Sequence, residues 1–378
     1  MAKRTRNILM ENVRIAVIGT GWMAQQHMEK ITDMAHASVG AVCDINQEVV
    51  DKLAKQYDCP GYTDHKQLLA DGVADAVLIA TPHFFHTSIG IDALQANHHV
   101  LVEKPISVHK SDCEKLIAGH TNKDLVFGAM FNQRTDTMYK KLRQVLRSGE
   151  AGEITRVQWT ITDWFRSDTY YTTGNWRATW AGEGGGALLN QCPHQLDMLI
   201  WLCGMPKKVH AFCRFGQYHD IEVEDDVTAY IEFENGASGV FITTTGESPG
   251  SNRLEINTTR GKFVAENEQL SFDRTEVSVP EFARTSTERM DHPPAWHCTL
   301  PTSGPGGQHL EIMENFVAAV RGKAELIAPA AEGIWSVELA NAMLYSAWTN
   351  QTVDMPLDGA AYEAILNKKI AGSRYKRS

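Results

Sequence analysis

A short apolar run that ends in a glycine-rich turn is the feature that most limits how this chain can fold. Residues 13–18 (VRIAVI) have the β-branched content of a buried strand, and residues 19–24 (GTGWMA) follow at once as G-x-G-x-x-A. The two glycines allow a tight turn and a close approach of the backbone to a pyrophosphate, while a small sixth residue lets the next helix pack against the strand. Residues 22–34 are predicted to form that helix, whose N-terminal N–H groups would face the anion.

An acidic residue ends the next predicted strand. Residues 37–44 (ASVGAVCD) finish at Asp44, where a carboxylate can accept hydrogen bonds from both ribose hydroxyls of an adenosine. The glycine pattern alone is a weak signal, but strand, turn, helix, strand and acid in register are specific; the alternative is a structural turn with a surface aspartate. Asp44 would repel a 2′-phosphate and no arginine follows it in DINQE, so the sequence predicts NAD rather than NADP.

Strands and helices continue to alternate up to about residue 134. Predicted strands at 75–82, 99–105 and 124–134 are separated by predicted helices at 86–97 and 111–121. This rhythm is typical of a parallel, doubly wound α/β sheet, which binds ligands at the carboxyl ends of its strands. Polar residues at those ends are therefore candidates for binding: Asp44, Thr81, His83, His86, Glu103, Lys104, Asn132 and Arg134.

The pattern changes after about residue 135. A predicted helix at 138–154 precedes a series of alternating segments, which predict an α+β domain with a large, mainly antiparallel open sheet. Residues 270–308 are expected to form a loop, and the acidic segment 222–226 is expected to be solvated. The sequence thus predicts an NAD-binding Rossmann domain at 1–134 and a substrate-binding and oligomerisation domain at 135–378. The predicted strands of the second domain are 156–165, 208–215, 225–233, 237–245 and 253–259.

Composition and charge exclude several classes of partner. The net charge of −10 argues against a nucleic-acid-binding protein, and no run approaches the roughly 18 apolar residues of a membrane helix. The apolar run at 8–10 is too short for a signal peptide. Seven scattered cysteines without CxxC or zinc-ligand spacing predict reduced thiols, no metal site and a cytoplasmic location. We expect a small-molecule ligand, with no nucleic acid or membrane as partner.

Lys104 directly follows residues 99–103 (HVLVE), at the rim of a predicted buried strand. Desolvation at that place would lower the pKa of the lysine towards neutrality. Pro105 restricts Lys104 to extended conformations, which would hold its side chain in one place. A lysine held in this way can act as a general acid or base. The alternative is a solvated lysine at a strand end.

Residues 184–197 (GGGALLNQCPHQLD) suit neither a regular helix nor a strand. The glycines would let the backbone pass close to a ligand, and a helix beginning near Asn190 would place Pro193 harmlessly in its first turn. Asn190, His194 and Asp197 would then share one helix face, although Asn190 could instead be an N-cap. The preceding loop, residues 165–184, is crowded with tyrosine and tryptophan, whose rings suit a pyranose, a nicotinamide or an interface.

Together these motifs resemble the glucose–fructose oxidoreductase/inositol dehydrogenase family (Gfo/Idh/MocA). The resemblance rests on GTGWMA, the Thr81-Pro82 strand end, EKP at 103–105 and GGGALLNQCPHQLD, and it spans most of the chain. It implies an N-terminal Rossmann domain that binds a nicotinamide cofactor, and a C-terminal open sheet that carries the substrate site and commonly the subunit interface. The chain departs from the family's TPNxxH, since His83 replaces the asparagine.

The resemblance assigns the catalytic lysine to Lys104 and the catalytic histidine to His194. The family's aspartate, four residues before that histidine, corresponds to Asn190, which cannot raise the basicity of His194 as a carboxylate would. An amide there can still bind a sugar hydroxyl or orient the imidazole, so Lys104, His194 and Asn190 are the predicted catalytic residues. Predicted cofactor-binding residues are Gly19, Thr20, Gly21, Trp22, Met23, Asp44, Thr81, Pro82, His83, His86, Glu103, Lys104, Asn132, Trp176 and Arg177. Predicted substrate-binding residues are Lys104, Arg134, Tyr171, Trp176, Asn190, His194 and His309.

We therefore predict an NAD-dependent oxidoreductase that oxidises a secondary ring hydroxyl of a sugar or glycoside, with a pyranose favoured, by hydride transfer to NAD. The alternative is an NAD-dependent glycoside hydrolase that transiently oxidises C3, eliminates the aglycone and reduces the product again. A non-catalytic NAD sensor is disfavoured because Lys104 and His194 are both present. A homodimer or homotetramer is expected.

Overall fold

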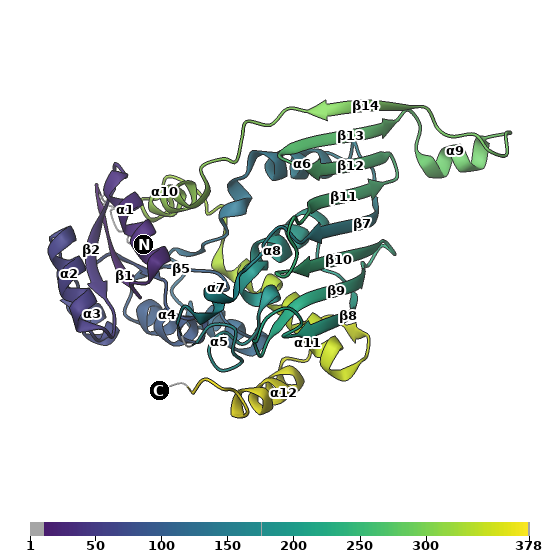
Figure 1. The fold of residues 1–378 in the computed structure, drawn as a ribbon. Helices are drawn as coiled ribbons and strands as arrows, with labels where there is room; N and C mark the ends of the chain where they lie inside the picture. Colours follow the sequence, from purple (N-terminus) through teal and green to yellow (C-terminus); the bar gives the residue numbers. More distant parts are fainter. Residues whose placement is uncertain (1–10, 175, 377–378) are drawn as a thin grey trace. The chain divides into compact units, whose positions relative to one another are not determined.

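The structure divides into two compact units, and each has its own sheet and core (Figure 1). A computed structural model describes residues 11–174 and 176–376. The first unit contains residues up to Ser107, Ser111–Asn132 and Gly307–Ile334, and the remaining residues form the second.

A six-stranded parallel sheet forms the centre of the first unit, in the order β3-β2-β1-β4-β5-β6. The strands are β1 (Val13–Ile18), β2 (Ala37–Cys43), β3 (Gly61–Tyr62), β4 (Ala76–Ile79), β5 (His99–Val102) and β6 (Phe127–Ala129). Because the chain leaves β1 towards β2 and later returns to β4 on its other side, the topological switch point lies between β1 and β4. The predicted parallel, doubly wound sheet is confirmed.

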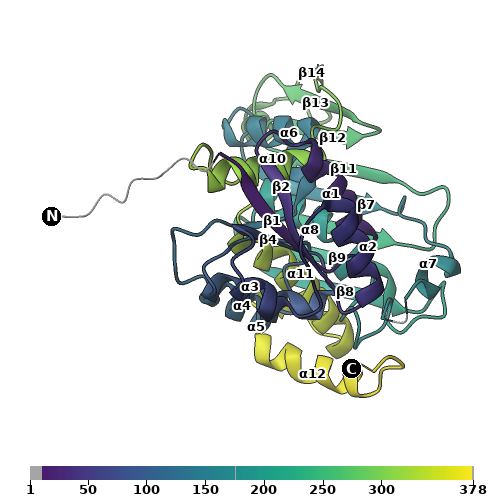
Figure 2. The ribbon, with the colours of Figure 1, turned by 90° about the vertical axis from the view of Figure 1, so that its left-hand side faces the viewer.

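Helices cover this sheet, whose strands are apolar almost throughout because both faces are buried. Figure 2 shows α1 and α2 beside β2, which both of them contact, and α4 contacts β4 and β5. A helix from much later in the chain, α10, packs against α1. The helices are α1 (Trp22–Asp33), α2 (Gln47–Tyr57), α3 (His65–Ala70), α4 (His86–Gln95), α5 (Lys110–Gly119) and α10 (Gln308–Val320).

A nine-stranded sheet forms the second unit, in the order β14-β13-β12-β11-β7-β10-β9-β8-β15. Neighbouring strands are antiparallel except β7 and β10, which run parallel, so the predicted mainly antiparallel sheet is confirmed. The strands are β7 (Ile154–Ile161), β8 (Lys208–Phe215), β9 (Glu224–Glu232), β10 (Ser238–Thr244), β11 (Asn252–Thr258), β12 (Gly261–Glu266), β13 (Gln269–Thr275), β14 (Ala295–Leu300) and β15 (Val353–Asp354).

Burial alternates along these strands, as a sheet with one packed face requires. The most buried helix is α8, which contacts α6 and follows directly on a short π-helix that touches β9 and β10. Helix α11 is tied to β8, since Ser346 Oγ accepts a hydrogen bond from the Ala211 N–H at 2.9 Å. The helices are α6 (Thr137–Arg147), α7 (Asp168–Thr172), α8 (Pro193–Cys203), α9 (Val279–Thr285), α11 (Gly333–Thr349) and α12 (Gly359–Ala371).

Two sequence-based predictions about this unit are wrong. Residues 270–308 are not one loop, because β13, α9 and the edge strand β14 lie within them (Figure 1). The segment 222–226 is not solvated, because Glu224 and Asp225 are fully buried. Their carboxylates accept hydrogen bonds from backbone N–H groups in place of water: Gly186 and Leu188 for Glu224, and residues 217–219 for Asp225.

In the described parts of the chain, no helix combines the length and the apolar character that a membrane span requires.

Candidate active site

The glycine-rich turn of the first unit lies against the carboxyl end of β4. Gly19 has φ +84°, and a Cβ atom there would lie 2.7 Å from the Thr81 backbone nitrogen and 2.8 Å from the Ala80 oxygen. Only glycine fits such a conformation and such a contact. The turn after β1 and the start of the segment after β4 therefore meet at the switch point, where a doubly wound sheet binds its ligand.

Asp44 holds this turn from the end of β2. Both the backbone N–H and the hydroxyl of Thr20 donate to Asp44 Oδ2, each at 2.8 Å, and the Asn46 N–H donates to Oδ1 at 3.0 Å. The carboxylate is thus fixed beside the glycine turn while remaining partly exposed. It is placed as a ribose-binding acid would be.

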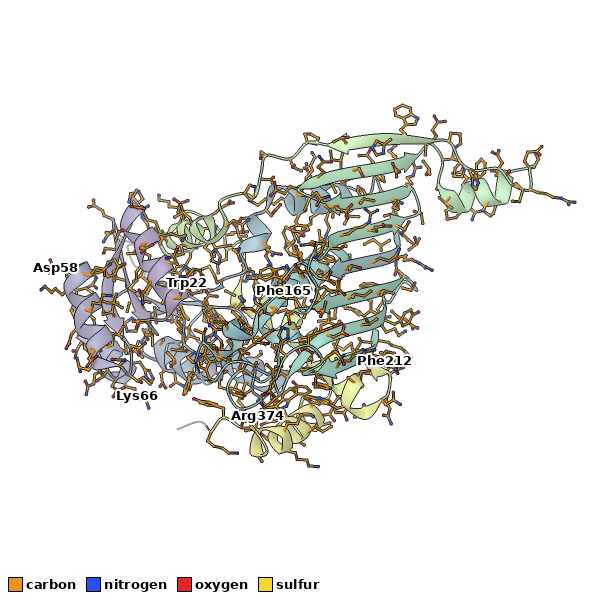
Figure 3. All side chains as sticks on the ribbon, viewed as in Figure 1. Trp22, Asp58, Lys66, Phe165, Phe212 and Arg374 are labelled. Atoms are coloured by element: carbon orange, nitrogen blue, oxygen red, sulfur yellow. The ribbon has the colours of Figure 1, made fainter. Side chains whose placement is uncertain are left out.

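The start of α1 is open to an anion. No side chain caps the helix at Gly21, and its first turn contains no acidic residue. Trp22 at the first helical position is 73% exposed (Figure 3). The N-terminal N–H groups of α1 therefore fit the pyrophosphate of a dinucleotide, with Asp44 for its ribose.

His86 ties together the ends of β4 and β5. It is fully buried, with Nε2 2.8 Å from the Thr81 oxygen and Nδ1 2.9 Å from the Pro105 oxygen. Burial lowers the pKa of His86, although both carbonyls and Glu103 favour the charged ring. A neutral ring donates to only one of the two carbonyls. His86 thus supports the strand ends, and its direct contact with the cofactor stays a prediction.

Glu103 carries a stable negative charge beside Lys104. Burial disfavours that charge, but the 2.6 Å hydrogen bond from His27 and the charges of His27, Lys104 and His309 lower the pKa of Glu103 to about 2. Its other oxygen accepts the Lys104 backbone N–H at 3.0 Å. Lys104 is half-buried, and its peptide bond to Pro105 is cis. The backbone of the predicted catalytic lysine is therefore anchored by a permanent anion.

His309 reaches this place from α10, far away in the sequence. Its ring lies 5.5 Å from that of His27, and burial lowers the pKa of His309 to about 4. Asn132 is held close to the same helix, because its Nδ2 donates to Gln308 Oε1 at 2.6 Å. The first unit thus brings the predicted residues Glu103, Lys104 and His309 together, and it places His83 5.9 Å from the ring of His86.

The glycine–histidine segment of the second unit begins with a wide π-helical turn, Ala187–Gln191, and α8 starts only at Pro193. Asn190 is therefore not the N-cap of α8, and it does not share a regular helix face with His194 and Asp197. The turn is held by Glu224, whose Oε1 accepts the N–H groups of Gly186 and Leu188 at 2.9 Å each. His194 is buried in the first turn of α8, 7% exposed.

Asp197 and Arg134 form a buried ion pair. The guanidinium donates from Nε and Nη2 to the two carboxylate oxygens at 2.8 and 2.6 Å, and the side chains are 2% and 1% exposed. A bidentate pair of this kind is strong and directional. It explains Asp197 as a structural partner, while substrate binding by Arg134 stays a prediction.

Glu183, a buried carboxyl that the sequence motifs did not indicate, lies beside Asn190. Glu183 is 2% exposed, and its Oε1 accepts a hydrogen bond from Asn190 Nδ2 at 2.6 Å. Its Oε2 accepts the Ala178 N–H at 2.7 Å, and Arg177 Nη1 is 3.8 Å from Oε1. Burial raises the pKa of Glu183 to about 7, and the nearby charge of Glu224 adds to the rise.

Tyr170, a second residue without an assigned role, joins the same cluster. Its hydroxyl accepts hydrogen bonds from Gln191 Nε2 at 3.0 Å and from Arg177 Nη1 at 3.1 Å, and it lies 3.5 Å from Asn190 Nδ2. The Arg177 guanidinium also lies 4.8 Å from the ring centroid of Trp176. Arg177 and Asn190 are thus brought together by contacts, whereas Arg177 and Trp176 as cofactor ligands stay predictions.

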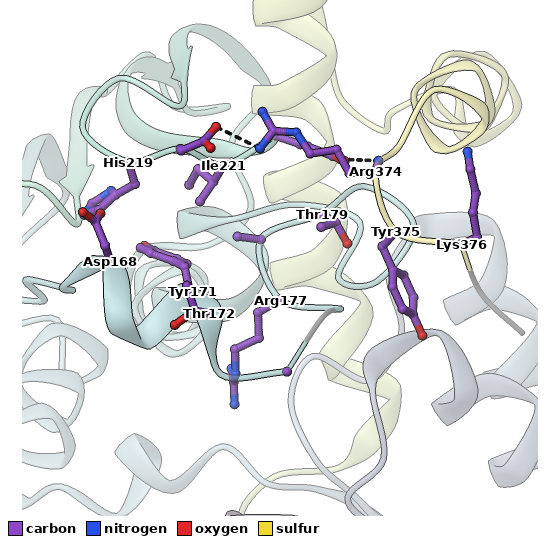
Figure 4. Close-up of a pocket in the computed structure, with 14 residues that line it drawn as sticks. Asp168, Tyr171, Thr172, Arg177, Thr179, His219, Ile221, Arg374, Tyr375 and Lys376 are labelled. Atoms are coloured by element: carbon purple, nitrogen blue, oxygen red, sulfur yellow. Dashed lines mark hydrogen bonds and ion pairs between the residues drawn. The ribbon is translucent and has the colours of Figure 1, made fainter.

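Tyr171 lines a cavity of about 810 Å³ in the second unit, together with Arg177 and His219 (Figure 4). Its hydroxyl donates to Thr245 Oγ1 at 2.9 Å, its ring lies 4.8 Å from His219, and burial raises the pKa of Tyr171 to about 12. Residues of the C-terminal segment also line the cavity, and Arg374 there donates to Asp220 at 2.8 Å. Tyr171 is therefore a neutral ring beside open space.

Comparison with known proteins identifies the family. Residues 13–131 match the model described as an oxidoreductase family with an NAD-binding Rossmann fold, and residues 139–264 match the Gfo/Idh/MocA C-terminal domain. This chain belongs to the Gfo/Idh/MocA family. Its fold agrees with WlbA dehydrogenase from Chromobacterium violaceum, solved with NADH and UDP-GlcNAcA, at 26% identity and a TM-score of 0.80, over 92% of this chain and 97% of that one.

Relatives in this family have different names. Myo-inositol 2-dehydrogenase of Thermotoga maritima is 25% identical over 68% of this chain and 75% of that protein. Levoglucosan dehydrogenase of Pseudarthrobacter phenanthrenivorans is 24% identical over 92% and 99%. An α-N-acetylgalactosaminidase of Shewanella oneidensis is 27% identical over 47% and 42%. The chain is accordingly an NAD-dependent oxidoreductase of a sugar dehydrogenase family, and NAD is its cofactor.

Proposed function

We propose that this protein oxidises a secondary ring hydroxyl of a pyranose sugar or glycoside. The observation that carries the proposal is the partly buried polar cluster around Asn190, formed with Tyr170, Arg177, Glu183 and Gln191. Carboxyl, amide and guanidinium groups suit the hydroxyls of a sugar ring, and the aromatic rings of the loop 165–184 suit its apolar face. The relatives named as dehydrogenases of inositol and levoglucosan support a ring hydroxyl as the reacting group.

The residues of the first unit fit the cofactor. The Gly19–Gly21 turn and the start of α1 would hold the pyrophosphate, Asp44 the adenosine ribose, and the segments after β4 and β5 the nicotinamide end. NAD supplies the acceptor for the hydride that leaves the sugar carbon.

Lys104 and His194 are the proposed acid–base residues. A hydride can leave the carbon only as the hydroxyl proton is removed, and an amine or imidazole near neutral pKa can accept that proton. Glu103 keeps the Lys104 backbone in place, and α8 holds His194 in a buried first turn. Because the two residues lie in different units, the role of each is tested by its own variant.

The test of the reaction is a substrate panel with NAD⁺. Free sugars, 1,5-anhydro sugars and glycosides are incubated with the enzyme, while NADH absorbance and product release are followed together. The proposal expects NADH and a keto sugar in equal amounts for at least one pyranose. No NADH with any ring hydroxyl compound would contradict it.

A second candidate is an NAD-dependent glycosidase that oxidises C3 transiently, and the relative named α-N-acetylgalactosaminidase favours keeping it. The ketone would acidify the neighbouring C–H, and a base would remove that proton before the aglycone leaves. Tyr171 stays protonated near neutral pH because burial raises its pKa to about 12, so we propose His194 as the base for this step. Phenol release from an aryl glycoside without accumulating NADH would favour this candidate over the dehydrogenase.

The proposal also covers the roles of the two domains, the oligomeric state and the location of the protein. Residues 1–134 would serve the cofactor, and residues 135–378 the substrate and self-association. The exposed rings of Phe212 and Tyr230 on neighbouring strands, 64% and 47% exposed, support a homodimer or homotetramer formed through the sheet. We propose a cytoplasmic location because the scattered cysteines of the sequence predict reduced thiols. Light scattering of the purified protein tests the oligomer.

A further inference from the structure

The cavity of about 810 Å³ in the second unit is large enough to hold a ring-sized group with its substituents. Sites for small molecules commonly measure roughly 300–1,000 Å³. Its lining comes from α7 and the residues up to Thr179, from the turn 219–222 and from the C-terminal segment 374–376 (Figure 4). Segments far apart in the sequence thus enclose one space.

Glu222 fixes the C-terminal wall of this cavity. Its carboxylate accepts hydrogen bonds from the Trp180 N–H at 3.1 Å, from the Ser373 hydroxyl at 2.7 Å and from the Arg374 N–H. Ser373 is buried, and the Arg374 guanidinium pairs with Asp220 at 2.8 Å. The wall is therefore formed by the folded chain itself, before any ligand binds.

The ionised side chains on the cavity wall are balanced in number. Three acids and three bases line it, and one acid and one base, Asp220 and Arg374, are paired with each other. A wall without an excess of either sign does not attract a phosphate or a carboxylate over an uncharged group. The acids are Asp168, Asp220 and Glu222, and the bases are Arg177, Arg374 and Lys376.

Two rings present their surfaces to the cavity. The rings of Tyr171 and His219 lie 4.8 Å apart, and the Tyr171 hydroxyl is fixed on Thr245. Both nitrogens of His219 bond inside the protein, Nδ1 at 3.1 Å from Asp225 Oδ2 and Nε2 at 2.8 Å from the Arg166 oxygen. Asp225 balances any charge on that ring. Tyr171 and His219 therefore offer ring surface, which suits the apolar face of a sugar or a phenol.

Arg177 and Asp168 supply the polar groups. A guanidinium has five N–H donors, and within the described residues that of Arg177 donates a single hydrogen bond, to the Tyr170 hydroxyl at 3.1 Å. Asp168 is exposed in the first turn of α7, and no hydrogen bond from another described residue reaches its carboxylate. A hydroxyl can accept from the guanidinium and donate to the carboxylate. The pair therefore suits a ring that carries hydroxyls.

The cavity adjoins the polar cluster around Asn190. Arg177 lines the cavity and also bonds to Tyr170 of that cluster. Ala178, the next lining residue, donates its N–H to Glu183, which in turn accepts from Asn190. A ligand held at the cluster could thus extend past Arg177 into the cavity.

We infer that this cavity is a second-ring subsite, which binds an uncharged, hydroxyl-bearing ring attached to the sugar that reacts. The ring is a second sugar or a phenolic aglycone, because both combine an apolar face with hydroxyls. The inference rests on the proposed function, because it takes a pyranose as the reacting part. It makes the substrate a glycoside and not a free monosaccharide.

Binding to the enzyme with NADH tests the subsite without any oxidation, because the reduced cofactor cannot accept a hydride. The methyl, hydroxyphenyl and glucosyl glycosides of each sugar in the panel are titrated by calorimetry. At least one two-ring compound should bind about thirtyfold more tightly than the methyl glycoside of the same sugar. The preferred compound tells whether the second ring is a sugar or a phenol. Equal affinities for all three compounds, or no binding of the two-ring compounds, would overturn the inference.

Two tryptophan substitutions distinguish filling of the cavity from a disturbed loop. Thr172 and Thr173 are both exposed, and both hydroxyls donate to the Thr169 oxygen, but only Thr172 lines the cavity. Thr172→Trp should reduce the thirtyfold preference to about one, and Thr173→Trp should keep it. A preference that survives in Thr172→Trp, or that both variants lose equally, would overturn the inference.

Removal of the polar groups tests the chemical class of the second ring. Asp168→Asn and Arg177→Gln should each weaken the preferred two-ring compound about tenfold, the scale of one hydrogen bond to a charged group. Unchanged affinity in both variants would overturn the assignment of a hydroxyl-bearing ring. Tighter binding of a compound with a carboxylate on its second ring would overturn the assignment of an uncharged one.

The result is separable from the proposed function. If the two-ring preference is found and lost in Thr172→Trp while no compound yields NADH from NAD⁺, the proposed function fails and the subsite stands. If methyl glycosides are oxidised with the same kcat/KM as the two-ring compounds and bind equally well, the proposed function stands and the inference fails.

Discussion

Two buried glutamates, one in each unit, show opposite electrostatics. Glu103 lies in the first unit beside His27, Lys104 and His309, and these charges lower its pKa to about 2 although burial opposes them. Glu183 lies in the second unit and is bonded to neutral N–H donors, while the Arg177 guanidinium stays 3.8 Å away; burial, with a smaller contribution from Glu224, raises its pKa to about 7. Burial alone therefore does not decide the charge; the charge of the bonded partner does. The proposed cofactor side holds a permanent anion, and the proposed substrate side holds a group that titrates near neutrality.

The largest effect is expected at Lys104. Replacing it by alanine (Lys104→Ala) removes the proposed proton acceptor next to the permanent anion, and kcat/KM should fall about 10³-fold, roughly 4 kcal/mol of transition-state stabilisation. Lys115→Ala, on the exposed side of α5, is the matched control and should remain active. Steady-state kinetics on the best sugar of the panel measures both. A near-normal kcat for Lys104→Ala would remove the lysine from the mechanism.

The substitution Glu103→Gln removes the permanent negative charge of the first unit. His27 then loses a buried anionic partner at 2.6 Å, and the free energy of unfolding at pH 7 should fall by about 3 kcal/mol. Because the folded pKa of Glu103 is lowered from 4.5 to about 2, its contribution is complete above pH 4.5 and is lost as the pH falls towards 2. Urea unfolding at several pH values measures it. A variant as stable as the wild type at pH 7 would contradict the permanent anion.

The contribution of Glu183 to stability depends on pH in the opposite direction. The folded pKa of Glu183 is raised from 4.5 to about 7, so its contribution to stability is complete below pH 4.5 and is lost as the pH rises through 7. Glu183→Gln removes this loss, and the variant should gain about 2 kcal/mol relative to the wild type between pH 5 and 8. The same urea series detects the gain. Parallel curves for the two proteins would show that Glu183 does not titrate in this range.

The smallest effect concerns the choice of cofactor. Asp44→Asn keeps an acceptor for Thr20 but removes the charge that would repel a 2′-phosphate. NAD binding should weaken about tenfold while NADP binding improves, and calorimetric titration with both cofactors gives the ratio. An unchanged ratio would mean that Asp44 serves the turn and not the ribose.

The cofactor side could be predicted from the sequence because its geometry is local. The glycine turn, the first turn of α1 and Asp44 follow from backbone requirements within 32 consecutive residues, 13–44. Lys104 could be proposed as the catalytic lysine because it comes shortly after a buried strand, β5. The position of His309 next to His27 could not be predicted from local sequence, because it depends on the packing of α10 against α1.

The substrate side was predicted less completely because its partners are contacts of the folded chain. The histidine motif indicated Asn190 and His194, but the π-helical turn depends on Glu224, more than 30 residues later. Glu183 escaped notice as one acid in a polar loop, although its position directly before three glycines of a buried segment was an available signal. The sequence contained the charges and not their burial.

Transfer of a labelled hydride tests the central claim most directly. A pyranose deuterated at its ring C–H positions is incubated with enzyme and NAD⁺ for a single turnover, and the nicotinamide and the sugar are analysed by mass spectrometry. The account predicts one deuterium in the reduced cofactor for each keto sugar formed, with the transfer lost in Lys104→Ala. Sugar converted while the cofactor stays free of deuterium would contradict it.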